Sequence, residues 1–176
     1  MEKSGSYGQF CPVAMAAELV CMRWTPLVLR ELLAGSTRFN DLRKGVPRMS
    51  PALLSTRLKE LEDAGIIERR RDSGSGGHDY HLTQAGRDLW PVVEALGIWG
   101  QRWLETRERL RNLDPSLLMW DMRRNLNPTP MPARRSTIQF LYPELQPSQQ
   151  NWWLVVDPGV GTDLCASDPG FEVDLY

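Results

Sequence analysis

Basic side chains that could contact nucleic-acid phosphates are concentrated between residues 38 and 71. This stretch holds nine Lys and Arg residues against five Asp and Glu residues, although the whole chain of 176 residues has a formal net charge of −1. Phosphate contacts by Lys and Arg supply most of the free energy of non-specific DNA binding. The local excess of basic residues is consistent with a nucleic-acid partner, although many proteins of neutral overall charge carry a patch of this size.

A helix that could present side chains to DNA bases is expected between residues 50 and 65. Ser50 is a favourable N-cap, and Pro51 follows at the first helical position, where its missing N–H costs nothing. Gly65 can end the helix in the left-handed conformation. The buried face is marked by leucines at helical spacing, namely Leu54, Leu58 and Leu61.

The outer face of this helix is small and polar, with acidic residues only towards its C-terminal end. A helix in the major groove needs small residues for close approach and polar tips for base edges. The alternative interpretation is an ordinary amphipathic surface helix. The predicted base-edge contacts are Ala52, Ser55, Thr56 and Lys59, with Ser50 at the start of the helix. The predicted phosphate contacts are Arg38, Arg48, Arg57, Arg69, Arg70 and Arg71.

A hairpin is expected directly after this helix. Residues 66–71 are apolar and then basic, residues 73–77 are Ser-Gly-Ser-Gly-Gly, and residues 78–82 alternate in polarity. A short helix over residues 39–44 and a turn over residues 46–49 precede the capped helix. This order of elements predicts a winged helix-turn-helix.

Three more helices are expected around this motif. The first covers residues 12–22, and the second covers residues 25–33 with Thr25 as its cap. Thr83 is expected to cap a long helix to about residue 111, bent at Pro91 because proline removes one backbone hydrogen bond. Its apolar stripe could pack against its own domain or form a dimer interface. The stripe consists of Leu89, Val93, Leu96, Trp99 and Trp103.

The character of the chain changes after residue 112. Residues 1–113 hold 17 basic against 14 acidic residues, whereas residues 114–176 hold 4 against 8. We expect an α+β protein with a winged helix-turn-helix domain over residues 1–112 and a small helix-plus-antiparallel-sheet segment over residues 113–176. The segment is expected to contain a helix at 115–126, a loop at 127–132 and strands at 136–142, 152–157 and 171–176.

Several classes of function and location are disfavoured by the composition. The chain shows no nucleophile–base pair, phosphate loop or metal-ligand cluster, so an enzyme, a metal site and a cofactor are not expected. His78 and His81 fall in the predicted hairpin, where solvated side chains are the simpler interpretation. The apolar runs are far shorter than the roughly 20 residues of a membrane span. With no apolar signal core near residue 1, a cytoplasmic protein is expected.

A set of motifs occurs in order along residues 11–110. They are Cys11-Pro12, the helix over residues 24–33, Arg38-Phe39-Asn40-Asp41-Leu42, Ser50-Pro51, Leu54, Leu58, Leu61, Ala64-Gly65, Tyr80-His81-Leu82-Thr83 and Gly86. In this order they resemble the HxlR-type branch of the winged-helix regulators. The resemblance implies a homodimeric transcription regulator that binds a pseudo-palindromic operator, with the apolar stripe at the dimer interface. The wing tip departs from the family by being shorter and richer in glycine.

Cys11 is a candidate redox sensor. It stands at the expected N-cap of the first helix, where free amides and the helix dipole favour a thiolate. In HxlR-type regulators that sense electrophiles or oxidants, the sensing cysteine occupies the matching position. The alternative interpretation is a small, tolerated residue at a helix start. Cys21 is expected inside the first helix, buried and inert, and Cys165 in a turn.

The C-terminal segment resembles the start of a sterol carrier protein type two domain. That resemblance implies a curved sheet that holds an apolar ligand, and the predicted contacts are Trp152, Trp153 and Phe171. The leading hypothesis is a dimeric, sequence-specific regulator that binds double-stranded DNA, with a small apolar effector as a further partner. The alternative is a carrier of small apolar molecules in which the winged helix only makes protein contacts.

Overall fold

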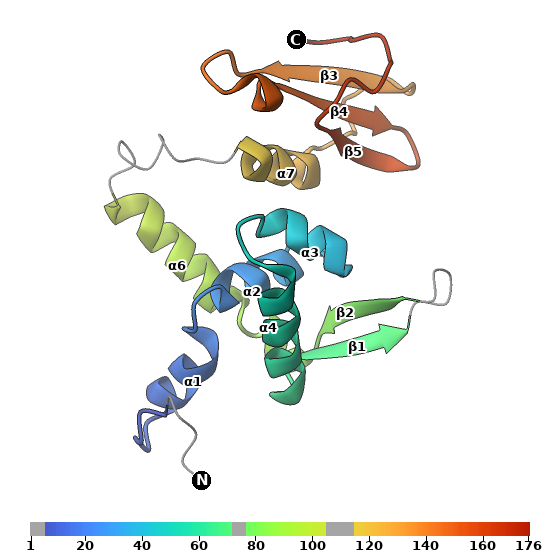
Figure 1. The fold of residues 1–176 in the computed structure, drawn as a ribbon. Helices are drawn as coiled ribbons and strands as arrows, with labels where there is room; N and C mark the ends of the chain where they lie inside the picture. The colour runs from blue at the N-terminus through green and yellow to red at the C-terminus, as the bar shows by residue number, and fades with distance from the viewer. Residues whose placement is uncertain (1–5, 72–76, 105–114) are drawn as a thin grey trace. The chain divides into compact units, whose positions relative to one another are not determined.

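The computed structural model describes residues 6–71, 77–104 and 115–176, and the chain divides into two compact units, Met1–Arg109 and Leu110–Tyr176. Helices and strands are present in both units, so the expected α+β class is confirmed. Figure 1 shows the elements of each unit. The N-terminal unit contains α1 (Pro12–Val20), α2 (Thr25–Leu33), α3 (Phe39–Gly45), α4 (Pro51–Asp63), β1 (Ile67–Arg71), β2 (His78–Leu82), α5 (Gln84–Arg87) and α6 (Trp90–Trp103). The C-terminal unit contains α7 (Pro115–Asn125), β3 (Ser136–Leu141), the 3-10 helix η2 (Pro147–Gln149), β4 (Asn151–Asp157) and β5 (Gly161–Cys165).

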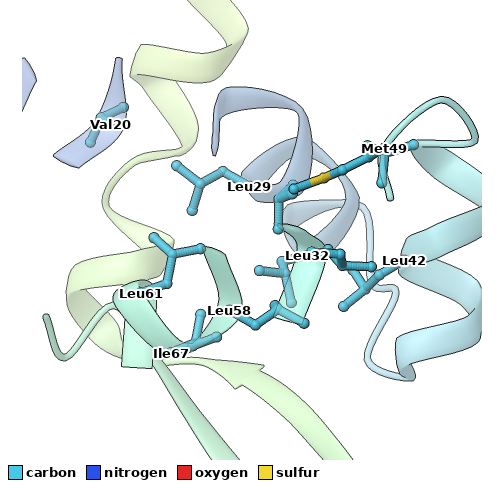
Figure 2. Packing of buried hydrophobic residues seen from close by; sticks show 11 residues of the cluster. Val20, Leu29, Leu32, Leu42, Met49, Leu58, Leu61 and Ile67 are labelled. Carbon is cyan, nitrogen blue, oxygen red and sulfur yellow. The ribbon is translucent and has the colours of Figure 1, made fainter. Parts of the chain in front are cut away.

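The core of the N-terminal unit is built around the leucine face of α4. Leu58 and Leu61 pack with Leu29 of α2 and with Ile67 of β1, as Figure 2 shows. Burying one such side chain contributes roughly 1.5–3 kcal/mol. The periodic leucines therefore pack one face of α4 against the rest of the unit. The order of helices and strands confirms the predicted winged helix-turn-helix.

The ends of α4 form as the residue types require. The Ser50 hydroxyl accepts a hydrogen bond from the Leu53 amide at 3.3 Å, which satisfies one of the free first-turn donors. Gly65 has a φ of +71°, a conformation that glycine adopts without the steric cost of a Cβ. The amide of Ile66 bonds back to the carbonyl of Leu61, so the chain leaves the helix directly into β1.

The start of α2 differs from the prediction. Thr25 is not the cap but the first helical residue, and its side chain is buried. The capping position belongs to Trp24, whose φ of +77° is unusual for a bulky residue. The reason is the tight reversal between α1 and α2, in which the carbonyl of Trp24 accepts bonds from the amides of Leu27 and Val28.

The single bent helix predicted after Thr83 is wrong, because two helices occupy this stretch. Thr83 caps the short α5 by accepting a bond from the Gly86 amide at 3.2 Å. Pro91 then lies in the first turn of α6, where its missing N–H breaks no hydrogen bond. The backbone of Leu104 is extended, so α6 ends at Trp103, and predicted positions 105–111 lie outside the described residues.

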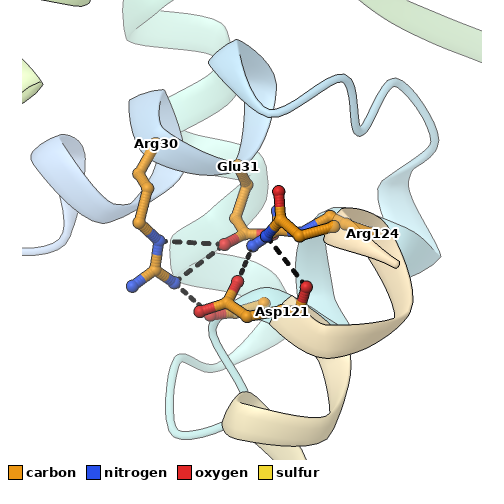
Figure 3. A network of polar contacts seen from close by, with 6 residues as sticks. Arg30, Glu31, Asp121 and Arg124 are labelled. Carbon is orange, nitrogen blue, oxygen red and sulfur yellow. Dashed lines mark hydrogen bonds and ion pairs between the residues drawn. The ribbon is translucent and has the colours of Figure 1, made fainter. Parts of the chain in front are cut away.

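The C-terminal unit is an antiparallel sheet in the order β3-β4-β5 with α7 on one face. Met119 of α7 packs against Trp152 and Leu154 of β4. Along α7 itself, Arg124 pairs with Asp121, which lies one turn earlier (Figure 3).

The third strand of this sheet is β5, and the predicted strand at 171–176 is wrong. The turn after Asp157 uses Gly159 with a φ of +81°, so β4 folds back at once into β5. Residues 171–176 form no strand, and an isolated parallel bridge joins Leu175 to Ile138. Asp174 fixes the tail there, because the Thr137 amide donates to its carboxylate at 2.8 Å and Arg134 also pairs with it. These two contacts lower the pKa of Asp174, so the carboxylate keeps its charge to a lower pH than an isolated Asp would.

No single helix in the described part of the chain is both long and apolar enough to span a membrane. Only α1 and α2 taken together, across an 82° bend, have the length and composition of a span.

Candidate DNA-binding surface

The outer face of α4 is exposed along the positions predicted to face bases. Ala52, Ser55, Thr56 and Lys59 are all exposed. The hydroxyl of Thr56 donates to the carbonyl of Ala52 at 3.0 Å, which leaves its oxygen able to accept a bond from a base. This face therefore offers small side chains with one donor-rich tip, Lys59, as a major-groove contact requires.

Several of the predicted phosphate contacts are paired with carboxylates inside the protein. Arg70 pairs with Glu68 on the same strand. Longer pairs of 3.9 Å join Arg69 to Glu62 of α4 and Arg38 to Asp79 of β2. Exposed pairs of this kind contribute only about 0–1 kcal/mol. DNA phosphates could therefore displace the carboxylates at little cost. Arg48 and Arg71 are likewise exposed.

Arg57 is the exception among the predicted phosphate contacts. Its side chain is only 12% exposed and pairs with Glu60 at 2.5 Å. The guanidinium also donates from Nε to the carbonyl of Arg23 at 3.4 Å and contacts the sulfur of Met22. Arg57 therefore ties α4 to the connection between α1 and α2, and its predicted contact with phosphate would require this side chain to rotate.

An ion pair with a buried carboxylate lies beside the helix that precedes α4. Glu31 of α2 is fully buried, and Arg30 pairs with it at 2.8 Å (Figure 3). Arg30 also donates to the carbonyl of Gly45 at 2.9 Å, at the last residue of α3. A buried carboxylate is costly unless it is paired, and Arg30 supplies the pairing charge while it also joins α2 to the end of α3. Sequence reasoning missed it; the signal was an acid at position 31 between the apolar residues of α2.

The base of the wing is held by three chain segments. β1 and β2 pair antiparallel, with Arg69 opposite Tyr80 and Arg70 opposite Asp79. The amide of Tyr80 also donates to the carbonyl of Thr37 at 2.8 Å, so the segment before α3 extends this hairpin. The predicted wing tip at residues 73–77 differs from the family in length and glycine content, and its residues 73–76 lie outside the described residues.

The predicted dimer stripe divides into two parts. Leu89 and Val93 pack against the core of the N-terminal unit. Leu96, Trp99 and Trp103 are 51%, 56% and 63% exposed, and α6 has no buried residue. Clustered exposed apolar side chains are typical of interaction sites, so this part of α6 is the candidate dimer surface. Further exposed apolar residues that the sequence reasoning did not single out are Phe10, Met15, Trp90, Val92 and Ile98.

The three cysteines are free and occupy different environments. Cys11 is partly exposed at the N-cap of α1, and its side chain makes no capping bond. Cys21 is exposed rather than buried, because α1 ends at Val20 and does not enclose it. Cys165 lies in β5 rather than in a turn, and burial together with the charge of Asp163 raises the pKa of its thiol.

The predicted apolar-ligand contacts are mostly enclosed by the C-terminal unit itself. Trp152 and Trp153 are each only 8% exposed, and Trp152 packs against α7. Phe171 is stacked by Arg135 at 4.4 Å and lines a cavity of about 410 Å³ beside β5. A ligand could thus reach Phe171 directly, whereas the tryptophans would first have to be uncovered.

Over the described ranges 6–71, 77–104 and 115–176, no three His, Cys, Asp or Glu side chains are grouped so that they could hold a metal ion.

Comparisons with known proteins agree on one family. A family model described as HxlR-like helix-turn-helix matches residues 19–108. The HTH-type transcriptional regulator Rv3095 of Mycobacterium tuberculosis is 35% identical over 144 residues, which cover 72% of this chain and 89% of the relative. The regulator YdeP of Bacillus subtilis is 32% identical over 57% of this chain and 79% of its own length. Neither relative has been characterised.

Two solved structures are similar to the N-terminal part. The redox regulator HypR in its oxidised form is 29% identical, with a TM-score of 0.51 over 54% of this chain and 99% of HypR. PA1607, a candidate transcription factor, is 28% identical, with a TM-score of 0.53 over 56% of this chain and 68% of its own.

Proposed function

Because this chain belongs to the HxlR-like helix-turn-helix family of transcriptional regulators, we propose that it acts as a homodimer that binds a pseudo-palindromic DNA operator through α4. The observation that carries the proposal is the exposed polar face of α4, held on the opposite side by Leu54, Leu58 and Leu61. The family is one of regulators rather than of enzymes. The alternative of a small-molecule carrier gains no support from the relatives, which are named as transcriptional regulators.

The proposal also assigns a separate role to each of the two parts of the chain. Residues 1–112 would bind DNA and dimerise, and residues 113–176 would form a separate α+β segment. Support comes from the family match, which covers residues 19–108 and stops before α7. A small apolar effector would act through the C-terminal segment, where Phe171 lines a cavity.

Loss of Arg70 and loss of Thr56 are expected to affect DNA binding in different ways. Arg70→Ala should weaken binding to all sequences and flatten the salt dependence by about one unit, because one phosphate contact is lost. Thr56→Ala should cost roughly 1–3 kcal/mol at the operator and relax the preference at one base pair. Operator fragments would be selected from genomic DNA, and binding would then be titrated at several salt concentrations. Unchanged operator binding in both variants would remove α4 and the wing from the interface.

Glu68→Gln changes the other partner of the ion pair between Arg70 and Glu68. Without the Glu68 charge, the Arg70 guanidinium is free to face phosphate and the strand loses a like-charge repulsion with DNA. We expect affinity for operator and non-operator DNA to rise by about the same factor, so the ratio between them should stay unchanged. If affinity fell instead, the carboxylate would be orienting Arg70 rather than competing with phosphate.

Redox control through Cys11 is a further part of the proposal. It is supported by the partial exposure of Cys11 and by the likeness to HypR, which is a redox regulator. We expect diamide to change operator affinity in the wild type and not in Cys11→Ser. Cys21→Ser is the control, because Cys21 is also exposed but caps the other end of α1. Equal sensitivity of wild type and Cys11→Ser, or none in either, would exclude Cys11 and leave the alternative of a tolerated residue at a helix start.

A further inference from the structure

A groove in the N-terminal unit lies beside the base of the wing. Its volume is about 470 Å³, which falls within the range of about 300–1,000 Å³ usual for small-molecule sites. Its walls come from the end of α2, from both strands of the hairpin, from α5 and from the first residue of α6. The groove is thus built from segments far apart in the sequence, around the element that carries Arg70.

The charged side chains that line this groove are Arg70 and Arg87, and His81 lines it beside them. No Asp or Glu is among the lining residues within the described part of the chain, although Glu68 pairs with Arg70 on the same strand. Over the same residues, the Arg87 guanidinium contacts only neutral acceptors. It donates to the carbonyl of Leu82 at 2.7 Å and to the amide oxygen of Gln84 at 3.2 Å. Its charge is therefore available to an anion entering the groove, because a guanidinium can hold a carboxylate through parallel N–H bonds.

The remaining walls are aromatic and aliphatic. Tyr80 and Trp90 line the groove, and the large apolar side chain of Trp90 is 49% exposed. Leu33 and Leu82 add aliphatic surface, and both also pack against the core. A flat aromatic ligand in the groove would bury these side chains. A DNA phosphate bound there would leave them exposed to solvent.

We propose that this groove is a binding site for small aromatic carboxylates, with Arg87 as the residue that holds the carboxylate. The bound anion also attracts the guanidinium of Arg70, which lines the same groove and is a predicted phosphate contact. Ligand binding then withdraws Arg70 from DNA and lowers operator affinity. This second step rests on the proposed function, whereas binding of the ligand itself does not.

The ligand arm of the test uses 2-naphthoate and its neutral isostere 2-naphthamide in calorimetric titrations of the full chain. The wild type should bind the carboxylate at least about tenfold more tightly than the amide, because only the carboxylate can form a charge-assisted hydrogen bond with Arg87. Arg87→Gln should lose that preference and Arg87→Lys should keep most of it. Lys44→Gln on α3 removes the same charge elsewhere and should bind like the wild type. Equal binding of the two compounds by the wild type, no binding of either, or full carboxylate preference in Arg87→Gln would overturn the site.

The DNA arm separates this site from the proposed function. Operator titrations without ligand test DNA binding alone. Saturating 2-naphthoate should lower the affinity of the wild type and flatten its salt dependence by about one unit, as Arg70→Ala does. In Arg70→Ala the ligand should have no further effect on DNA. If the ligand binds but wild-type DNA affinity is unchanged, the coupling through Arg70 is wrong while DNA binding through α4 stands.

Discussion

Trp99→Asp is expected to convert the protein into monomers that bind operator DNA poorly. Trp99 stands with Leu96 and Trp103 on the exposed part of α6, where a second copy would cover about the same residues by twofold symmetry. A carboxylate in the centre of that surface would be buried without a partner. Because two linked binding sites gain about 10²- to 10⁴-fold in overall affinity, loss of the dimer should weaken operator binding by about 10²-fold or more.

The measurement is sedimentation velocity at micromolar concentration together with titration of full and half operators. Gln101→Asp is the matched control, since about 100° per residue places Gln101 on nearly the opposite side of α6 from Trp99. It should remain dimeric and bind the full operator like the wild type. The two half-sites should lie about one DNA turn, or roughly 34 Å, apart. A wild-type chain that sediments as a stable monomer would contradict the dimer.

Gly86→Ala is expected to lower the free energy of unfolding of the N-terminal unit by at least about 2 kcal/mol. This value lies in the upper half of the range of about 1–3 kcal/mol that overpacking a core costs. A Cβ at Gly86 would overlap the backbone carbonyl of Ile66, which cannot move aside as the end of a side chain can. That carbonyl already accepts bonds from the amide and hydroxyl of Thr83, both at 3.0 Å. The substitution would therefore separate α5 from the start of the wing.

Urea unfolding followed by circular dichroism would measure the change. Ala85→Ser is the control, because it adds one heavy atom to the exposed side of the same short helix. It should shift the free energy of unfolding by no more than about 0.5 kcal/mol. If Gly86→Ala unfolds at the same urea concentration as Ala85→Ser, the close contact between α5 and Ile66 is not a feature of the folded protein.

The start, face and end of α4 were all predictable from residues 50–65. These features are the Ser50 cap, the proline after it, the leucine spacing and Gly65. Each acts through neighbouring residues, so it can be recognised in the sequence without knowledge of the rest of the fold. The same holds for the hairpin and for α7. The exposed positions on α4 then follow from the buried ones by helical geometry alone.

Other features depended on partners distant in the sequence. Arg30, which pairs with the buried Glu31, also reaches the carbonyl of Gly45 at the end of α3. Arg57 is held away from the outer face by the carbonyl of Arg23, which lies on the connection between α1 and α2. Leu89 faces the core while Trp99 remains exposed, although both belong to one periodic stripe.

What the sequence by itself determined is thus the kind of protein and its local elements: a capped recognition helix, a basic hairpin and a mixed C-terminal segment. Only the tertiary structure decided which arginines are free to face outward, where the predicted long helix breaks and which strand completes the second sheet. The physical reason is that caps and periodicity act between residues a few positions apart. Ion pairing and burial instead select among many candidate partners, and that selection is made only when segments such as α4 and the α1–α2 connection, or Gly86 and Ile66, come into contact.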